Sequence, residues 1–187
     1  MKKPYRIAVI DYGMSNMFSI ENALNMLGLE CVVTSDHERI ISADGAILPG
    51  VGAFPEAMKR IDQFGLGEAI RKFISSGKPF MGICLGMQLL FSRGEEYGIH
   101  DGLGLIKGVV KELKLNSHLK LPHVGWNNLV DMKLHPLLKG IRENIDFYFL
   151  HSQVCIPEDN NAILASARLP GALGFRQLAH PHPSRTP

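Results

Sequence analysis

A cysteine between two glycines, within residues 82–88, is the feature that most limits what this chain can fold into. An apolar run ends just before Gly82, and apolar residues resume after Cys84. Glycine on both sides, at Gly82 and Gly86, allows a sharp bend and keeps the surroundings of the thiol clear. The segment predicts a strand, a tight turn and a helix that continues through residues 89–91, with Cys84 at the helix N-terminus, where the dipole favours a thiolate.

The pattern alone leaves two interpretations of Cys84 open. A cysteine on such a turn is typical of a nucleophile that is presented above a parallel sheet. A free cysteine is also a common small apolar residue of protein cores, and turn glycines occur by chance. The rest of the sequence is needed to distinguish a nucleophile from a buried core cysteine.

Short apolar runs alternate with segments of helical spacing along the first half of the chain. Strands are expected at residues 6–10, 31–34 and 46–48 and in the run before Cys84. Two amphipathic helices are expected, each closed by a glycine, and their apolar positions are Met17, Ile20, Leu24 and Leu27 before Gly28, and Leu66, Ile70, Phe73 and Ile74 before Gly77. This alternation predicts an α/β fold with a doubly wound, mostly parallel sheet and helices on both faces.

Three turns follow the expected strands and should meet at one edge of the sheet, where such folds bind ligands. They are residues 11–13, residues 49–52 and the turn at Cys84. The Pro-Gly-Val-Gly turn is either an ordinary connection or a loop that aims N–H groups at a developing oxyanion. The oxyanion-hole candidates are Gly50, Val51, Gly52 and Leu85.

The second half of the chain is less regular. Strands are expected at residues 105–110, 147–150 and 162–165, and residues 122–127 are expected to form a loop. Gln88 lies one helical turn beyond Cys84, so it is either an exposed helix residue or a ligand for a polar substrate group. His151 and Ser152 follow an expected strand, where their backbone could line a site.

Composition excludes several classes of protein. The 187 residues suit a single domain, the net charge is +2 and the basic residues are scattered, so no nucleic-acid partner is expected. No apolar run is long enough for a membrane span, and no metal site or cofactor is expected. Three cysteines at unrelated spacings, Cys31, Cys84 and Cys155, favour free thiols in the cytoplasm.

Five motifs in register closely resemble one family, the glutamine amidotransferase subunit of imidazole glycerol phosphate synthase. They occupy residues 11–16, 48–54, 82–88, 122–127 and 147–152. The resemblance implies that Cys84 attacks the side-chain amide of glutamine, that residues 49–52 supply oxyanion-hole N–H groups, and that Gln88, His151 and Ser152 hold the substrate. It also implies a heterodimer with a (β/α)₈-barrel cyclase that uses the ammonia in histidine biosynthesis, with Asn16, Trp126 and Asn127 near the subunit interface.

The tail, residues 168–187, departs from the family pattern. It has no acidic residue, and its Gln177 and His180 only partly match the element that carries the family's catalytic His and Glu. A truncated or out-of-frame C-terminus is therefore expected. The alternatives are an active glutaminase with His180 or His182 as base, an impaired homologue, a cysteine hydrolase or chaperone-like protein of the same general fold, and an amidotransferase subunit that serves a cell-surface sugar pathway. The motif at residues 122–127 argues against the third.

Overall fold

A parallel sheet forms the first half of the molecule. The computed structural model describes residues 4–114, 120–142 and 145–167. The sheet has the order β2-β1-β3-β4, and its strands are β1 (Arg6–Ile10), β2 (Glu30–Thr34), β3 (Gly45–Leu48) and β4 (Phe80–Gly82). Ala8, Val9 and Ile10 of β1 are fully buried, so both faces of the sheet are covered. The predicted α/β class with a mostly parallel sheet is confirmed.

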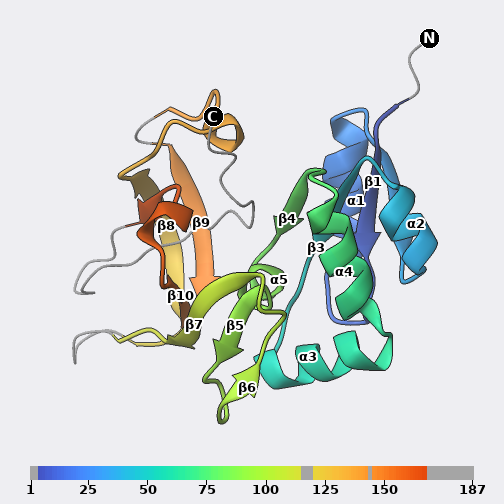
Figure 1. Cartoon of the computed structure of the whole chain (residues 1–187). Coiled ribbons are helices and arrows are strands. Elements are labelled where there is room, and N and C mark those ends of the chain that lie inside the picture. The colour runs from blue at the N-terminus through green and yellow to red at the C-terminus, as the bar shows by residue number, and fades with distance from the viewer. Residues whose placement is uncertain (1–3, 115–119, 143–144, 168–187) are drawn as a thin grey trace.

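The helices cover this sheet, as Figure 1 shows. They are α1 (Met17–Met26), α2 (His37–Ser42), α3 (Phe54–Gln63), α4 (Leu66–Ser75) and α5 (Leu85–Gln88). The predicted apolar stripe of α4 is buried, whereas the one predicted for α1 is mostly not: only Leu24 is buried, and Leu27 is 73% exposed. Gly28 and Gly77 follow α1 and α4 with φ of +69° and +76°, the left-handed conformation expected after a helix C-cap. The short helix α2 and the helix α3 were not predicted.

Two further sheets make up the second half, and most of their pairings are antiparallel. One has the order β10-β7-β5-β6 and the other the order β11-β8-β9. The strands of the first are β5 (Phe91–Gly94), β6 (His100–Asp101), β7 (Ile106–Glu112) and β10 (Gln153–Pro157). Those of the second are β8 (His123–Val130), β9 (Asp146–His151) and β11 (Ser166–Ala167). In Figure 1 the β8–β9 ribbon lies on the opposite side of β4 from α1 and α2.

Three local predictions were wrong. Residues 123–127 are not a loop, because they pair with β9 as part of β8. Residues 89–91 do not extend the helix, since α5 ends at Gln88 and Phe91 begins β5. Leu89 and Leu90 are buried, and an apolar run of this length would be buried in a helix or in a strand, so it does not distinguish the two. Residues 162–165 are not a strand, because Asp159 caps a 3₁₀ helix at Asn160–Ala162 and the strand follows at Ser166.

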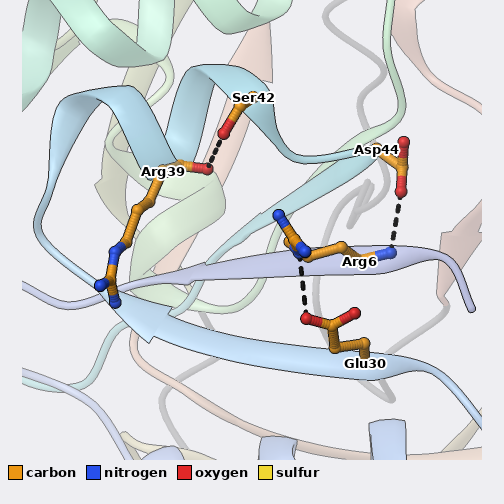
Figure 2. A network of polar contacts seen from close by, with 5 residues as sticks. All are labelled: Arg6, Glu30, Arg39, Ser42 and Asp44. Atoms are coloured by element: carbon orange, nitrogen blue, oxygen red, sulfur yellow. Dashed lines mark hydrogen bonds and ion pairs between the residues drawn. The ribbon is translucent and has the colours of Figure 1, made fainter.

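A polar network ties β1 to its neighbours at the end of the sheet where β1 begins (Figure 2). The Arg6 side chain pairs with Glu30 across the β1–β2 pair at 3.0 Å, and the Arg6 N–H donates to Asp44 at 2.9 Å. Both side chains of the ion pair are about one-third exposed, so the pair contributes at most about 1 kcal/mol to stability. This network lies at the amino end of β1, opposite the carboxyl ends of the strands, where such folds bind ligands.

Candidate active site

Cys84 occupies a strained turn between β4 and α5. Its φ of 54° and ψ of −118° lie outside the regions that ordinary residues adopt, at a cost of about 1–3 kcal/mol. Close packing explains the glycines around it: a Cβ on Gly86 would overlap the Leu48 carbonyl oxygen, and a Cβ on Gly82 would lie 2.6 Å from the Cα of Met87. The predicted tight turn is confirmed, and the Cys84 side chain is exposed.

The carboxyl ends of β1, β3 and β4 meet at this turn. The Tyr12 hydroxyl donates to the Pro49 carbonyl at 2.8 Å, and the Val51 N–H donates to the Met14 carbonyl at 2.9 Å. The Ile83 N–H donates to the Leu48 carbonyl at 2.9 Å. The strand order reverses between β1 and β3, so the three loops surround the position where doubly wound folds bind ligands.

Residues 49–53, between β3 and α3, are here called the oxyanion loop. Val51 is 54% exposed, and Gly52 has a φ of +107°, which only glycine adopts without strain. The Val51 N–H is committed to Met14, so it is not available to a ligand in this arrangement. The Leu85 N–H is the first of α5 and makes no backbone bond within the described residues, so it remains a free donor next to Cys84.

Two buried groups near the thiol stay protonated at neutral pH. Burial, and secondly the charge of a Cys84 thiolate, raise the pKa of Tyr12. The same two causes, in the same order, raise the pKa of Cys155 on β10 to about 12. Neither group can therefore take a proton from Cys84. If Cys84 acts as a nucleophile, another side chain has to serve as its base.

The residues expected to bind substrate lie on two elements. Gln88 is buried at 5% exposure, and its N–H donates to the Cys84 carbonyl at 3.2 Å, which fixes it one turn beyond the thiol. His151 ends β9, and its Nδ1 is 2.8 Å from the Gln153 carbonyl oxygen. The Ser152 carbonyl accepts a hydrogen bond from the Leu113 N–H at 2.8 Å, which fixes the backbone of Ser152 against the segment after β7.

The expected interface residues do not form one cluster. Trp126 is 68% exposed and packs edge-on against Tyr148 at 5.4 Å, with the exposed residues Val124 and Leu150 on the same face of the β8–β9 ribbon. Asn127 points to the other face, where its Oδ1 lies 2.8 Å from His123 Nε2. Asn16 caps α1, and Figure 1 shows that helix on the other side of β4 from the β8–β9 ribbon.

The expectations for Gln177, His180 and His182 concern residues outside the described part of the chain. Within residues 4–114, 120–142 and 145–167, no group of three His, Cys, Asp or Glu side chains could hold a metal ion. The same residues contain no helix with the length and apolarity that a membrane crossing needs.

Comparison with known proteins places the chain in a family. Residues 8–173 match the family Glutamine amidotransferase class-I. The chain is 48% identical over 160 residues to the imidazole glycerol phosphate synthase subunit HisH of Aquifex aeolicus, which covers 85% of this chain and 76% of that protein. It belongs to the HisH family. HisH of Geobacillus kaustophilus is 42% identical over 190 residues, with coverage of 95% of this chain and 90% of that protein.

Solved structures agree on the fold. A crystal structure of a glutamine amidotransferase superposes with a TM-score of 0.65 at 19% identity, and it covers 85% of this chain and 79% of its own. The PurLQS structure from Thermotoga maritima also gives a TM-score of 0.65, at 21% identity, with coverage of 91% and 77%. At such identities the likeness supports the class I amidotransferase fold of this HisH-family chain and nothing finer.

Three residues that contribute to the site were not predicted as such. Tyr12, Met14 and Cys155 contact the oxyanion loop or influence the thiol electrostatically. The meeting of the turn after β1 with residues 49–52 was predicted and is confirmed, but the particular hydrogen bonds of Tyr12 and Met14 to Pro49 and Val51 are visible only in the structure. Cys155 gives no indication in the sequence, because its neighbours resemble any buried strand.

Proposed function

We propose that this chain is the glutaminase subunit of imidazole glycerol phosphate synthase. Cys84 attacks the side-chain amide carbon of glutamine, the C–N bond breaks to release ammonia, and water hydrolyses the thioester to glutamate. The observation that carries the proposal is an exposed cysteine on a strained turn, beside the oxyanion loop, in a chain of the HisH family. No cofactor is required for this chemistry.

The oxyanion of the tetrahedral intermediate would be held by N–H groups on both sides of Cys84. Leu85 offers one donor at the start of α5, and Gly50, Val51 or Gly52 of the oxyanion loop offers another. Because the Val51 N–H is bonded to Met14, its use requires that peptide to turn. The resting arrangement is therefore one of low activity.

The base that takes the Cys84 proton is not one of the two buried groups described beside the thiol. Tyr12 and Cys155 are excluded by their raised pKa values. The histidines that follow His151 in the sequence are His180 and His182, and we propose these two as candidate bases. Each can be tested by substitution with alanine, which should lower kcat by about 10²–10⁴-fold at the true base.

The substrate and the partner would use different surfaces. Gln88 and the backbone at His151 and Ser152 would bind glutamine. The exposed Trp126–Tyr148 face would contact a (β/α)₈-barrel cyclase, because aromatic side chains are enriched in interfaces and large apolar residues are exposed here. Asn16 and Asn127, which the resemblance also implies near the interface, lie apart from this face. The heterodimer would act in the cytoplasm in histidine biosynthesis.

Labelling with a chloroketone analogue of glutamine tests the proposal without requiring turnover. The analogue should alkylate Cys84, and excess glutamine should protect it, as followed by intact-protein mass. A Cys31→Ala variant is the matched control, since Cys31 is a free thiol on β2 and should not affect labelling. Labelling that persists in Cys84→Ala would contradict the proposal.

A further inference from the structure

Tyr12 is the largest kind of side chain that this core buries completely, and it carries a polar group into it. It follows β1, has 0% exposure, and packs with the apolar residues of the main core. A phenylalanine would fill much the same space without a hydroxyl to satisfy. The Tyr12 hydroxyl is bonded to the Pro49 carbonyl at 2.8 Å, so its one polar atom is directed at the oxyanion loop.

That bond fixes the orientation of a whole peptide unit. The peptide between Pro49 and Gly50 is planar, so a carbonyl held toward Tyr12 directs the Gly50 N–H to the opposite side. The ring of Pro49 restricts its own φ as well. Gly50 is also wedged in place: a Cβ there would overlap the Tyr12 hydroxyl and lie 2.9 Å from the Gly86 nitrogen. The first half of the loop is therefore packed closely between Tyr12 and the turn at Cys84, with no space for a side chain at Gly50.

The second half of the loop is held much less firmly. The Val51 side chain is more than half exposed. The loop is held at this point by one hydrogen bond, from the Val51 N–H to the Met14 carbonyl. Such a bond contributes on the order of 1 kcal/mol. Gly52, with its φ of +107°, follows directly and tolerates rotations that other residues resist.

We propose that Tyr12 is a positioning residue that anchors the Pro49–Gly50 peptide, so that reorientation of the oxyanion loop is confined to Gly50–Gly52. Anchored this way, the loop can release Val51 from Met14 while its start stays in register with the Cys84 turn. The inference deepens the proposed function and rests on it for its catalytic consequence. The anchoring itself is a structural statement that can be tested separately.

The protonation state of Tyr12 suits this role. An anchor that donates a hydrogen bond must keep its proton while Cys84 is a thiolate. Burial and the negative charge of Cys84 both raise the pKa of Tyr12, so the thiolate strengthens the hold of the phenol on its proton.

Hydrogen exchange in the full chain tests the anchor directly. In Tyr12→Phe the Val51 amide should exchange about tenfold faster than in the wild type, because the start of the loop no longer restrains it. The Val9 amide in β1 should be unchanged, which distinguishes local loosening from general destabilisation. Tyr5→Phe is the matched control, since Tyr5 is 70% exposed at the other end of β1. Unchanged exchange at Val51, or equal acceleration at Val9, would overturn the proposal.

Two alkylation rates connect the anchor to the chemistry. The glutamine chloroketone should label Cys84 more slowly in Tyr12→Phe by about tenfold, since its reaction builds negative charge on a carbonyl oxygen. Iodoacetamide has no such requirement, and its rate should not change. A wild type that the chloroketone does not label would count against the proposed function, whereas equal chloroketone rates in a labelled wild type and Tyr12→Phe would count against the anchor.

The unmodified protein provides a measurement in case Tyr12→Phe does not fold. A buried, bonded hydroxyl proton exchanges slowly enough to be seen by NMR. It should show a nuclear Overhauser effect to the Gly50 α-protons, because a Cβ at Gly50 would contact that hydroxyl. A rapidly exchanging Tyr12 hydroxyl in the folded protein would overturn the proposal.

Discussion

The Val51 N–H donates to the Met14 carbonyl at 2.9 Å, and this bond closes the oxyanion loop onto the turn after β1. An N–H committed to a backbone carbonyl is not available to a substrate oxygen. The thiol of Cys84 is presented on its strained turn all the same. Under the proposed function, Cys84 is already presented as the nucleophile, whereas use of the Val51 N–H in the oxyanion hole requires a change of backbone conformation.

We expect the proposed cyclase partner to turn the Gly50–Val51 peptide, and so to raise kcat far more than it lowers KM. One oxyanion-hole donor is worth about 10²–10³ in kcat, so saturating cyclase should raise glutaminase kcat by about 10²-fold or more. Steady-state glutamate formation with and without the partner measures this. A partner effect confined to KM would mean that the loop already serves the oxyanion when the chain is alone.

Replacing Gly50 with alanine should damage both stability and the site. The added Cβ would overlap the Tyr12 hydroxyl and approach the Leu85 Cβ to 3.0 Å. Overpacking of this kind costs about 1–3 kcal/mol in the free energy of unfolding, which urea denaturation measures.

Gly125→Ala is the matched control for that change. Its new Cβ would make only an ordinary contact of 3.7 Å with His123, and Gly125 has no strained φ. Its free energy of unfolding should stay within about 0.5 kcal/mol of the wild type. Equal stability of the two variants would show that Gly50 is not wedged against Tyr12.

Stability should fall in mild acid because of His151. Burial lowers the pKa of His151 below its ordinary value of 6.5; a bond to the Gln153 carbonyl opposes this, and nearby His123 adds to it. The folded state then binds fewer protons at this side chain than the unfolded chain. The resulting stability is fully present above pH 6.5 and is lost as the pH falls through the lowered pKa.

Urea unfolding of His151→Gln should accordingly show a weaker pH dependence than the wild type between about pH 8 and about pH 5. If the free energy of unfolding depends on pH in the same way in His151→Gln and in the wild type, His151 is not the group responsible.

Trp126 should report on the partner by its own fluorescence. It is the single tryptophan of the chain and is 68% exposed, so burial against the cyclase should shift its emission to the blue. Trp126→Ala should weaken binding, measured by calorimetry, by about 2 kcal/mol or roughly 30-fold in Kd. Tyr97→Ala, which removes a residue that is 83% exposed, should bind normally. An unshifted emission on complex formation would place the interface elsewhere.

The sequence predicts the first half of the fold well because local pattern and tertiary context agree there. Leu66, Ile70, Phe73 and Ile74 form one buried stripe on α4, and the apolar run of β1 is buried on both faces. The turn at Cys84 is predicted correctly because glycines at 82 and 86 permit a sharp bend, and the structure shows that a side chain at either position would clash with neighbouring backbone.

The errors occur where pairing with distant strands decides the structure. Residues 123–127 contain glycine and follow a proline, so they resemble a loop until β9 pairs with them. Phe91 leaves the helical pattern because it pairs with Ile106. The role of Tyr12 could not be predicted for a related reason. Its hydrogen bond to the Pro49 carbonyl joins residues 37 positions apart, and no local sequence pattern indicates such a contact.

Glutamate formation by the Cys84→Ser variant tests the central claim most directly. Wild-type chain with saturating cyclase should convert glutamine to glutamate, Cys31→Ser should match it, and Cys84→Ser should fall to background. Near-normal turnover by Cys84→Ser, or no turnover by the wild type while the cyclase is bound, would contradict the assignment of Cys84 as the nucleophile of a working glutaminase.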